Sequence, residues 1–181
     1  MMLNNSCYSF RHKGFTLVEL ITVIILISIL SVSVFSRFSG TSGFAEYTYQ
    51  ARLISTLRNM QTRAMYDNRD GYCFKVILDT SATPAFGPPV LTYAPIGDKD
   101  DTCGSAIDYN NPDYLTTNAT EMSKEGVGLT TTPNFDYIDF DGLGRPKQGG
   151  ADCSASCKIT LTGETTVSVC IESEGYIHAC E

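Results

Sequence analysis

The chain has 181 residues and a formal net charge of −7, with 20 acidic residues against 13 basic ones. This balance argues against a broad electrostatic grip on nucleic acid, which needs clustered lysine and arginine side chains. The sequence holds no phosphate-binding loop, nucleophile elbow or metal-binding helix motif, so it predicts neither an enzyme nor a bound cofactor.

A long apolar run lies near the N-terminus. Residues 15–36 contain one charged side chain, Glu19, among apolar, serine and threonine residues. As a helix, this run would be roughly 33 Å long, enough to cross a hydrocarbon core of about 30 Å. We therefore predict a membrane-spanning helix over 15–38. Arg11 and Lys13 precede it, and the positive-inside bias places the N-terminus in the cytoplasm and the rest of the chain across the membrane.

A secretory signal peptide also combines a basic start with an apolar core, and it is the alternative interpretation of this segment. The run is long for a signal core, and an acidic residue within it is unexpected. A carboxylate inside a bilayer costs about 2.5 to 3.5 kcal/mol on insertion scales, so Glu19 indicates a function.

The residues around this point resemble a known processing site. Residues 11–20, Arg-His-Lys-Gly-Phe-Thr-Leu-Val-Glu-Leu, resemble the leader junction of type IV pilins and of the pseudopilins of type II secretion. The resemblance implies that a prepilin peptidase cleaves after Gly14, methylates Phe15, and leaves 1–14 as a discarded leader. It also implies a path from the inner membrane to an extracellular fibre, with other pilin subunits and an inner-membrane assembly platform as partners.

The chemistry of Glu19 supports this interpretation independently. Cleavage would leave a free ammonium group about one helical turn from the carboxylate. In a fibre, both groups would lie among apolar helices, where a carboxylate is tolerated when it is paired with the amine of an adjacent subunit. Glu19 would then set the axial register of a new subunit. A simpler role, interaction with the helix macrodipole, is compatible with this one and does not explain the neighbouring residues.

Loss of the leader would also change the cysteine count and the charge. It removes Cys7, Arg11 and Lys13, which takes the net charge from −7 to −9. An even set of cysteines in an exported domain predicts up to three disulfides. We expect no metal site, because these cysteines form no Cys-x-x-Cys pair and a single histidine remains. The six candidates are Cys73, Cys103, Cys153, Cys157, Cys170 and Cys180.

Residues 39–69 continue the helical pattern with an amphipathic stripe. Its apolar positions are Tyr47, Leu53, Leu57, Met60 and Ala64. We expect the stripe to pack on a globular domain over 70–181, and turn residues at 68–71 to end the helix.

The remaining residues predict a β-rich domain and an α+β fold. Strands are expected at 72–78 and 135–140, and a hairpin at 158–162 and 165–171. Long acidic loops cover 79–132, interrupted by a strand at 90–94 and tethered by a cysteine. Three aspartates, Asp136, Asp139 and Asp141, match part of a calcium loop, but Tyr137 stands where a ligand is needed, so we expect a solvated surface.

The hairpin predicts one disulfide directly. If Gly163 and Glu164 form a two-residue turn, Cys157 lies opposite Cys170 at a non-hydrogen-bonded pair, where side chains approach closely. Exclusion then leaves Cys73 with Cys103 and Cys153 with Cys180.

The C-terminal region resembles minor pilins and pseudopilins of the GspH/FimT-like class, on residues 140–146, 159–163 and 174–177. Its strand content and cysteines also resemble a minor pilin of the mannose-sensitive haemagglutinin (MSHA) pilus. We expect a structural subunit that joins or primes an attachment fibre. The alternatives are a type II secretion pseudopilin, an adhesive tip subunit that binds a surface ligand through loops 79–132, and an unprocessed membrane-tethered domain.

Overall fold

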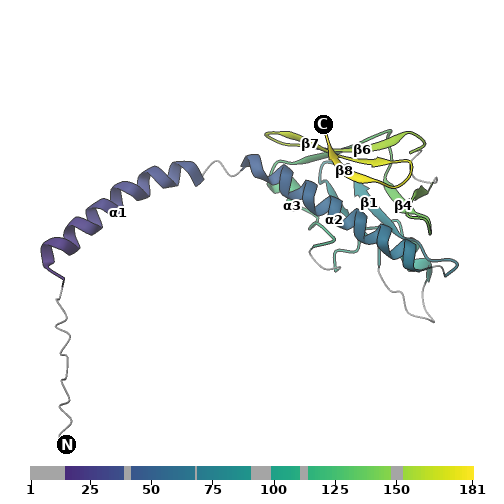
Figure 1. The fold of residues 1–181 in the computed structure, drawn as a ribbon, viewed down its shortest axis with the longest axis horizontal. Coiled ribbons are helices and arrows are strands. Elements are labelled where there is room, and N and C mark those ends of the chain that lie inside the picture. The colour runs from purple at the N-terminus through teal and green to yellow at the C-terminus, as the bar shows by residue number, and fades with distance from the viewer. Residues whose placement is uncertain (1–14, 39–41, 68, 91–98, 111–113, 148–152) are drawn as a thin grey trace, which may run out of the picture. The chain divides into compact units, whose positions relative to one another are not determined.

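The computed structural model describes residues 15–38, 42–67, 69–90, 99–110, 114–147 and 153–181. The chain forms two compact units, residues 1–40 and residues 41–181. The first unit contains helix α1, Leu17–Phe38, and the second contains all the other elements. Figure 1 shows the order of the elements along the chain.

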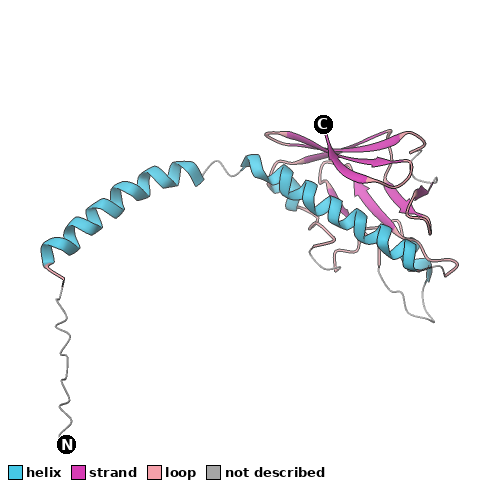
Figure 2. Cartoon of the chain, viewed as in Figure 1, coloured by secondary structure: helices cyan, strands magenta, loops and turns pink. Residues whose placement is uncertain are grey.

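The second unit is an α+β head, as predicted. A short 3-10 turn, η1 (Ser42–Phe44), leads into helix α2, Ala45–Tyr66, which lies against two antiparallel sheets (Figure 2). The helix begins and ends inside the predicted range 39–69. The turn after it contains Gly71, which has a positive φ of 87° and so suits glycine at that point.

Each sheet has four strands. The first is ordered β2 (Ala85–Gly87), β1 (Lys75–Asp79), β4 (Tyr137–Phe140) and β5 (Pro146–Lys147). The second is ordered β3 (Gly128–Thr132), β6 (Ser156–Thr162), β7 (Thr166–Glu172) and β8 (Ile177–Cys180). Inward side chains of both sheets form one core with the buried face of α2.

Three predictions about these elements need correction. Tyr47 is not on the buried stripe of α2: it is 53% exposed, whereas Tyr49 is 4% exposed. The range 79–132 is not irregular throughout, because it contains β2, η2 (Lys99–Cys103), α3 (Glu121–Lys124) and β3. The first strand is β1, which begins three residues later than predicted.

The predicted strand at 90–94 falls almost wholly outside the described residues. Val90 itself belongs to no strand.

The hairpin register differs from the prediction by one residue. Thr162 pairs with Thr166, so the loop has three residues, and Gly163 N–H donates to the Thr165 carbonyl at 2.9 Å. Cys157 therefore faces Ile171, and Cys170 faces Lys158. Because neighbouring residues on a strand point to opposite faces, Cys157 and Cys170 cannot meet.

The disulfides follow from this register. Cys73 is bonded to Cys103, as expected by exclusion, across 30 residues of chain. The expected pairs Cys157 with Cys170 and Cys153 with Cys180 are wrong. Instead, the bonds join Cys153 to Cys157, next to the start of β6, and Cys170 to Cys180, between β7 and the C-terminal edge strand β8.

Candidate functional site

The N-terminal end of α1 carries the predicted processing and register residues. Gly14 lies outside the described residues. Phe15 is the first described residue, and its side chain is 80% exposed. Thr16 precedes the helix, and its Oγ1 accepts a hydrogen bond from the Glu19 backbone N–H at 3.2 Å. The spacing Thr16-x-x-Glu19 is that of a capping box, a signal in the sequence that we had not used.

Glu19 thus lies in the first turn of α1, with an exposed side chain. At this position its side chain lies near the positive end of the helix macrodipole. The hydrogen bond that involves Thr16 uses the Glu19 backbone, so the carboxylate remains available to a group outside the chain. The geometry is compatible with a cap and with pairing to a neighbouring subunit.

Beyond the Glu19 carboxylate, apolar side chains lie on every side of the described surface of α1. Its large aliphatic side chains are exposed, and its hydroxyl groups bond to the helix itself. Thr22 Oγ1 donates to the Glu19 carbonyl at 2.9 Å, and Ser28 Oγ to the Ile24 carbonyl at 2.7 Å. A helix that is apolar all round needs an apolar environment, either lipid or other helices. The exposed residues are Leu17, Val18, Leu20, Ile21, Val23, Ile24, Ile25, Leu26, Ile27, Ile29 and Leu30.

Among the residues that the structure describes, no helix is both long enough and apolar enough to cross a membrane.

The first turn of α2 is joined to the β6–β7 loop by a buried carboxylate. Glu46 is 1% exposed, and its Oε1 accepts a hydrogen bond from the Thr165 N–H at 3.0 Å. This bond holds the pKa of Glu46 below its ordinary value, although burial acts in the opposite direction. A Cβ on Gly163 would lie only 2.2 Å from the same oxygen. A side chain at position 163 would therefore displace the Glu46 carboxylate or the loop, a contact that no local sequence pattern indicates.

Further along α2, Arg52 holds the segment that leads to α3. Its Nη1 forms an ion pair with Glu121 Oε1 at 2.8 Å, and its Nη2 donates to the Thr116 carbonyl. Burial, together with the negative charges of Glu121 and Glu125, raises the pKa of Tyr49 to about 12. A long connection is thereby fixed on the helix, which explains how the crossover from the first sheet to the second is held in place.

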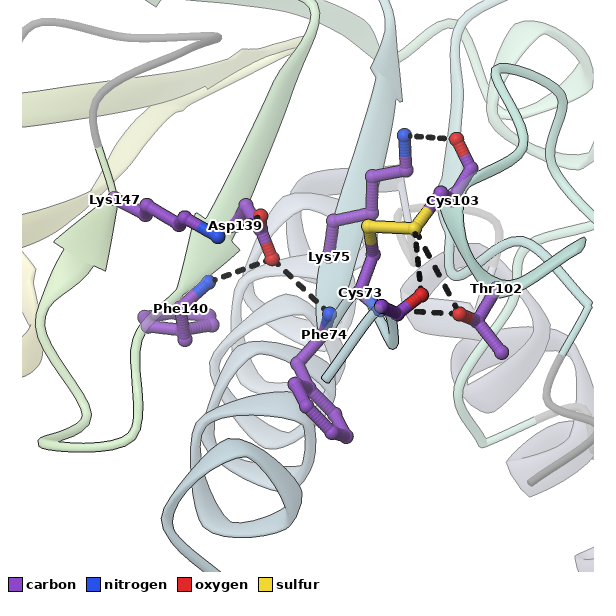
Figure 3. The surroundings of a disulfide bond; sticks show 9 residues. Cys73, Phe74, Lys75, Thr102, Cys103, Asp139, Phe140 and Lys147 are labelled. Atoms are coloured by element: carbon purple, nitrogen blue, oxygen red, sulfur yellow. Dashed lines mark hydrogen bonds and ion pairs between the residues drawn. A yellow bond between two sulfur atoms is a disulfide. The ribbon is translucent and has the colours of Figure 1, made fainter. Parts of the chain in front are cut away.

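The disulfide between Cys73 and Cys103 ties η2 to the start of β1 (Figure 3). Lys75 Nζ donates to the Cys103 carbonyl at 2.6 Å, and Thr102 Oγ1 accepts from the Cys73 N–H at 3.0 Å. Burial lowers the pKa of Lys75, an effect that Asp139 partly offsets. These contacts anchor the η2 segment beside the start of β1.

Two of the three aspartates of the partial calcium pattern, Asp139 and Asp141, bond to groups of the same chain, whereas Asp136 is exposed. Asp139 Oδ1 accepts from the N–H groups of Phe74 and Phe140, both at 3.0 Å (Figure 3). Asp141 Oδ1 accepts from the Arg145 N–H at 2.9 Å, and its Oδ2 pairs with the guanidinium at 3.0 Å. Within the described part of the chain, no three histidine, cysteine, aspartate or glutamate side chains are grouped to hold a metal ion.

A cavity of about 550 Å³ opens between the end of β1 and residues 105–109. Its walls include Asp79, Asp136 and Tyr109, and its apolar lining includes Ile77 and Ile107. The cavity lies where the predicted loop range 79–132 meets the end of β1 and Asp136, the residue before β4. It is a hollow of a size that could receive a small ligand or a side chain.

Comparison with known proteins supports the N-terminal motif and the fold. Residues 9–35 match the family model described as the prokaryotic N-terminal methylation motif. No curated protein matches the chain at the threshold of significance. The structure is similar to the crystal structure of the type IV minor pilin FimU from Pseudomonas aeruginosa strain PAO1. That match has a TM-score of 0.50 and 9% identity, and it covers 78% of this chain and 92% of the other.

Proposed function

We propose that this chain, which belongs to the type IV pilin family in the broad sense that includes pseudopilins, is a minor subunit of a surface pilus. The proposal rests on two features that occur together in this chain. Residues 9–35 match a methylation motif, and the disulfide-bonded α+β head is similar in fold to a minor pilin. The family is structural and not enzymatic. The cysteine-rich β head favours the MSHA type within it.

In this proposal the chain is first anchored in the inner membrane with its N-terminus in the cytoplasm. A prepilin peptidase cuts after Gly14 and methylates Phe15. The all-round apolar surface of α1 suits transfer from lipid into a bundle of neighbouring helices. Glu19, in the first turn, then pairs with the N-terminal amine of an adjacent subunit and fixes the axial position of the new one.

An adhesive role is a second candidate. It is favoured by the 550 Å³ cavity in the head, with its two aspartates and exposed tyrosine. Both roles can exist together, since a subunit held by α1 leaves its head available to a ligand at the surface of the fibre.

The experiment that tests the proposal compares three full-length variants in the native cells. We expect Gly14→Leu to retain its leader and to be absent from sheared fibres. Glu19→Gln should be cleaved but incorporated much less than the wild type. The matched control is Thr22→Val, which removes a hydroxyl group that donates to the carbonyl of Glu19 in the same helix. Cleavage of the Gly14→Leu protein, or normal incorporation of the Glu19→Gln protein, would contradict the proposal.

A further inference from the structure

The cavity of about 550 Å³ lies on the outer face of the first sheet. Along β1, Val76 and Leu78 belong to the main core, so Ile77 and Asp79 point to the opposite face of the strand. Ile77 is nevertheless only 8% exposed. Residues 105–107 and Tyr109 form the other side of the cavity, which is therefore a space between the end of a strand and a separate segment of the chain.

That second segment is held by bonds at both of its ends. On its N-terminal side, Cys103 is bonded to Cys73 (Figure 3). Towards its C-terminal side, the Asp108 N–H donates to the Pro88 carbonyl at 3.1 Å. The two walls are thus fixed to the head before any ligand arrives. A preformed cavity avoids the free-energy cost of ordering a loop on binding.

Two carboxylates line the cavity without a cationic partner. Asp79 Oδ1 accepts a hydrogen bond from the Ser81 N–H at 2.9 Å, which orients this carboxylate. The Asp136 carbonyl accepts from the Leu78 N–H at 2.7 Å, so Asp136 lies beside the end of β1, and its side chain is exposed. Within the described part of the chain, neither carboxylate forms an ion pair, and no lysine, arginine or histidine lines the cavity.

The sequence around the second segment adds further negative charge. Residues 98–113 contain one basic residue, Lys99, and five acidic ones, which are Asp98, Asp100, Asp101, Asp108 and Asp113. A site with an excess of one sign of charge attracts ligands of the opposite sign and raises their local concentration. The charge therefore favours a cation.

The remaining lining favours a cation that carries an apolar chain. Ile77, Leu78 and Ile107 supply apolar surface, and Tyr109, at 45% exposure, supplies an aromatic ring. Burial, and then the negative charge of Asp79, raise the pKa of the Tyr109 phenol, so the ring lies within the field of that carboxylate. An aromatic face attracts an ammonium group, and methylene groups pack on apolar side chains.

Other ligand classes match the cavity less well. Calcium takes about six to eight oxygen ligands, whereas the described residues contain no group of three side chains suited to hold a metal ion. A neutral sugar would leave both carboxylates without a charged partner. An ammonium group has three N–H donors and forms charge-assisted hydrogen bonds with carboxylates.

We propose that this cavity binds an alkylammonium group, which is a primary amine at the end of an apolar chain. Asp79 and Asp136 accept hydrogen bonds from the ammonium, and the ring of Tyr109 contacts it. The chain of the ligand packs on the isoleucines. The inference names the ligand class for the adhesive role and rests on that part of the proposed function. The same chemistry is offered by a lysine residue of a protein and by a free diamine.

The test is an NMR titration of the full-length, isotope-labelled protein in detergent micelles, followed at the amides of residues 77–81 and 105–109. The probes are Nα-acetyl-lysine methylamide, 1,5-diaminopentane and the uncharged Nα-acetyl-norleucine methylamide. We expect the lysine derivative to bind about tenfold more tightly than the norleucine derivative, from two ionic contacts and one cation–π contact. Equal binding of these two derivatives would overturn the inference.

The order of the two amines identifies the source of the ligand. Tighter binding of the lysine derivative supports a lysine residue of a protein, and tighter binding of 1,5-diaminopentane supports a free diamine. Both orders support the proposed ligand class. Tighter binding of methyl glucoside or of Ca²⁺ than of either amine, at the same amides, would overturn it.

Substitutions then locate the binding charge. We expect Asp79→Asn and Asp136→Asn each to lower the affinity for the lysine derivative about threefold. Asparagine retains an oxygen that can accept from the Ser81 N–H. The matched control is Asp101→Asn, which makes the same change in charge at an exposed position of the nearby segment, outside the cavity lining. An equal loss of affinity in this control would overturn the inference.

This result is independent of the fibre. A failure to bind amines in micelles would leave the proposed pilus subunit intact. Absence of the chain from sheared fibres would contradict the proposed function without changing the measured affinity for the amines.

Discussion

Glu46 in the first turn of α2 and Thr165 in the β6–β7 loop are joined by a hydrogen bond of 3.0 Å between a buried carboxylate and a backbone N–H. This contact fixes the loop on the helix. It also stabilises the three-residue loop, because the N–H that it uses belongs to the third loop residue. The contact thus supports the observed register of the β6–β7 hairpin.

The first prediction concerns Gly163. An alanine there would place its Cβ 2.2 Å from Glu46 Oε1, so either the carboxylate or the loop must move. We expect Gly163→Ala to destabilise the protein by about 1 to 3 kcal/mol, the usual cost of overpacking a buried contact. Gly128→Ala is the control, since its nearest neighbour would be 3.6 Å away. Denaturant unfolding checks both, and equal stability of the two variants would contradict the contact.

The second prediction concerns pH. The folded-state pKa of Glu46 lies below its ordinary value of 4.5, chiefly because the Thr165 N–H bonds to the charged form. On acidification the unfolded state therefore binds the proton first. The stabilisation is present above pH 4.5 and is lost as the pH falls through the folded-state pKa.

The Glu46→Gln variant isolates this effect. We expect it to be less stable than the wild type at neutral pH by about 1 to 2 kcal/mol, because it loses a charged hydrogen bond. The difference should shrink as the pH falls below 4.5 and through the lower folded-state pKa, measured by unfolding at a series of pH values. A difference that stays constant with pH would show that the carboxylate charge does not stabilise the fold.

The third prediction ranks two disulfides. Cys73 and Cys103 close 30 residues of chain, and Cys170 and Cys180 close 10. On the loop-entropy model, replacing both members of the first pair by alanine should cost about 3 to 4 kcal/mol, against about 2 to 3 kcal/mol for the second. Urea unfolding of the two double variants measures the difference. A larger loss for the shorter loop would indicate that strand β8 depends on its bond for more than chain entropy.

The fourth prediction concerns the pair Arg52 and Glu121. Arg52→Met keeps the apolar stem and removes both the ion pair and the bond to the Thr116 carbonyl. We expect faster hydrogen exchange at the amides of α3 and of residues 114–117, with little change in β6 and β7. Lys124→Met, at an exposed position in α3, is the control. Faster hydrogen exchange at amides throughout the head would mean that Arg52 supports global stability, and not only the segment that leads to α3.

The helices were predictable because their signals are local. Leu53, Leu57, Met60 and Ala64 recur at helical spacing and all lie in the core, and the apolar run that contains α1 is continuous. Tyr47 and Tyr49 could not be distinguished, because they stand two residues apart and both suit a half-buried helix. The side that faces the sheets is decided by residues far away in the sequence.

The hairpin shows why the disulfides were mispaired. Gly163 and Glu164 form a plausible two-residue turn, and local rules favour it. The observed loop adds Thr165, because Glu46, 119 residues earlier, bonds its N–H. One extra loop residue turns Cys157 inward and Cys170 outward, so each cysteine takes a nearer partner. Long-range contacts of this kind leave no local pattern.

In the candidate site, too, some residues were predictable from local motifs and others were not. Phe15 and Glu19 were predictable because the processing motif is a short run of fixed spacing, and the capping role of Thr16 follows from that spacing too. Asp79 and Tyr109 could not be linked from sequence, since one ends β1 and the other lies far along the loop that follows. The cavity that they share becomes evident only in the folded head.

The central claim is that the chain is a processed subunit of a fibre. The most direct test is mass spectrometry of fibres sheared from the native cells, reading the N-terminal peptide of this protein. We predict a chain that begins at a methylated Phe15 and is present at low abundance relative to the main subunit. A chain that retains residues 1–14, or that begins after a cleavage on the C-terminal side of α1, would contradict the claim.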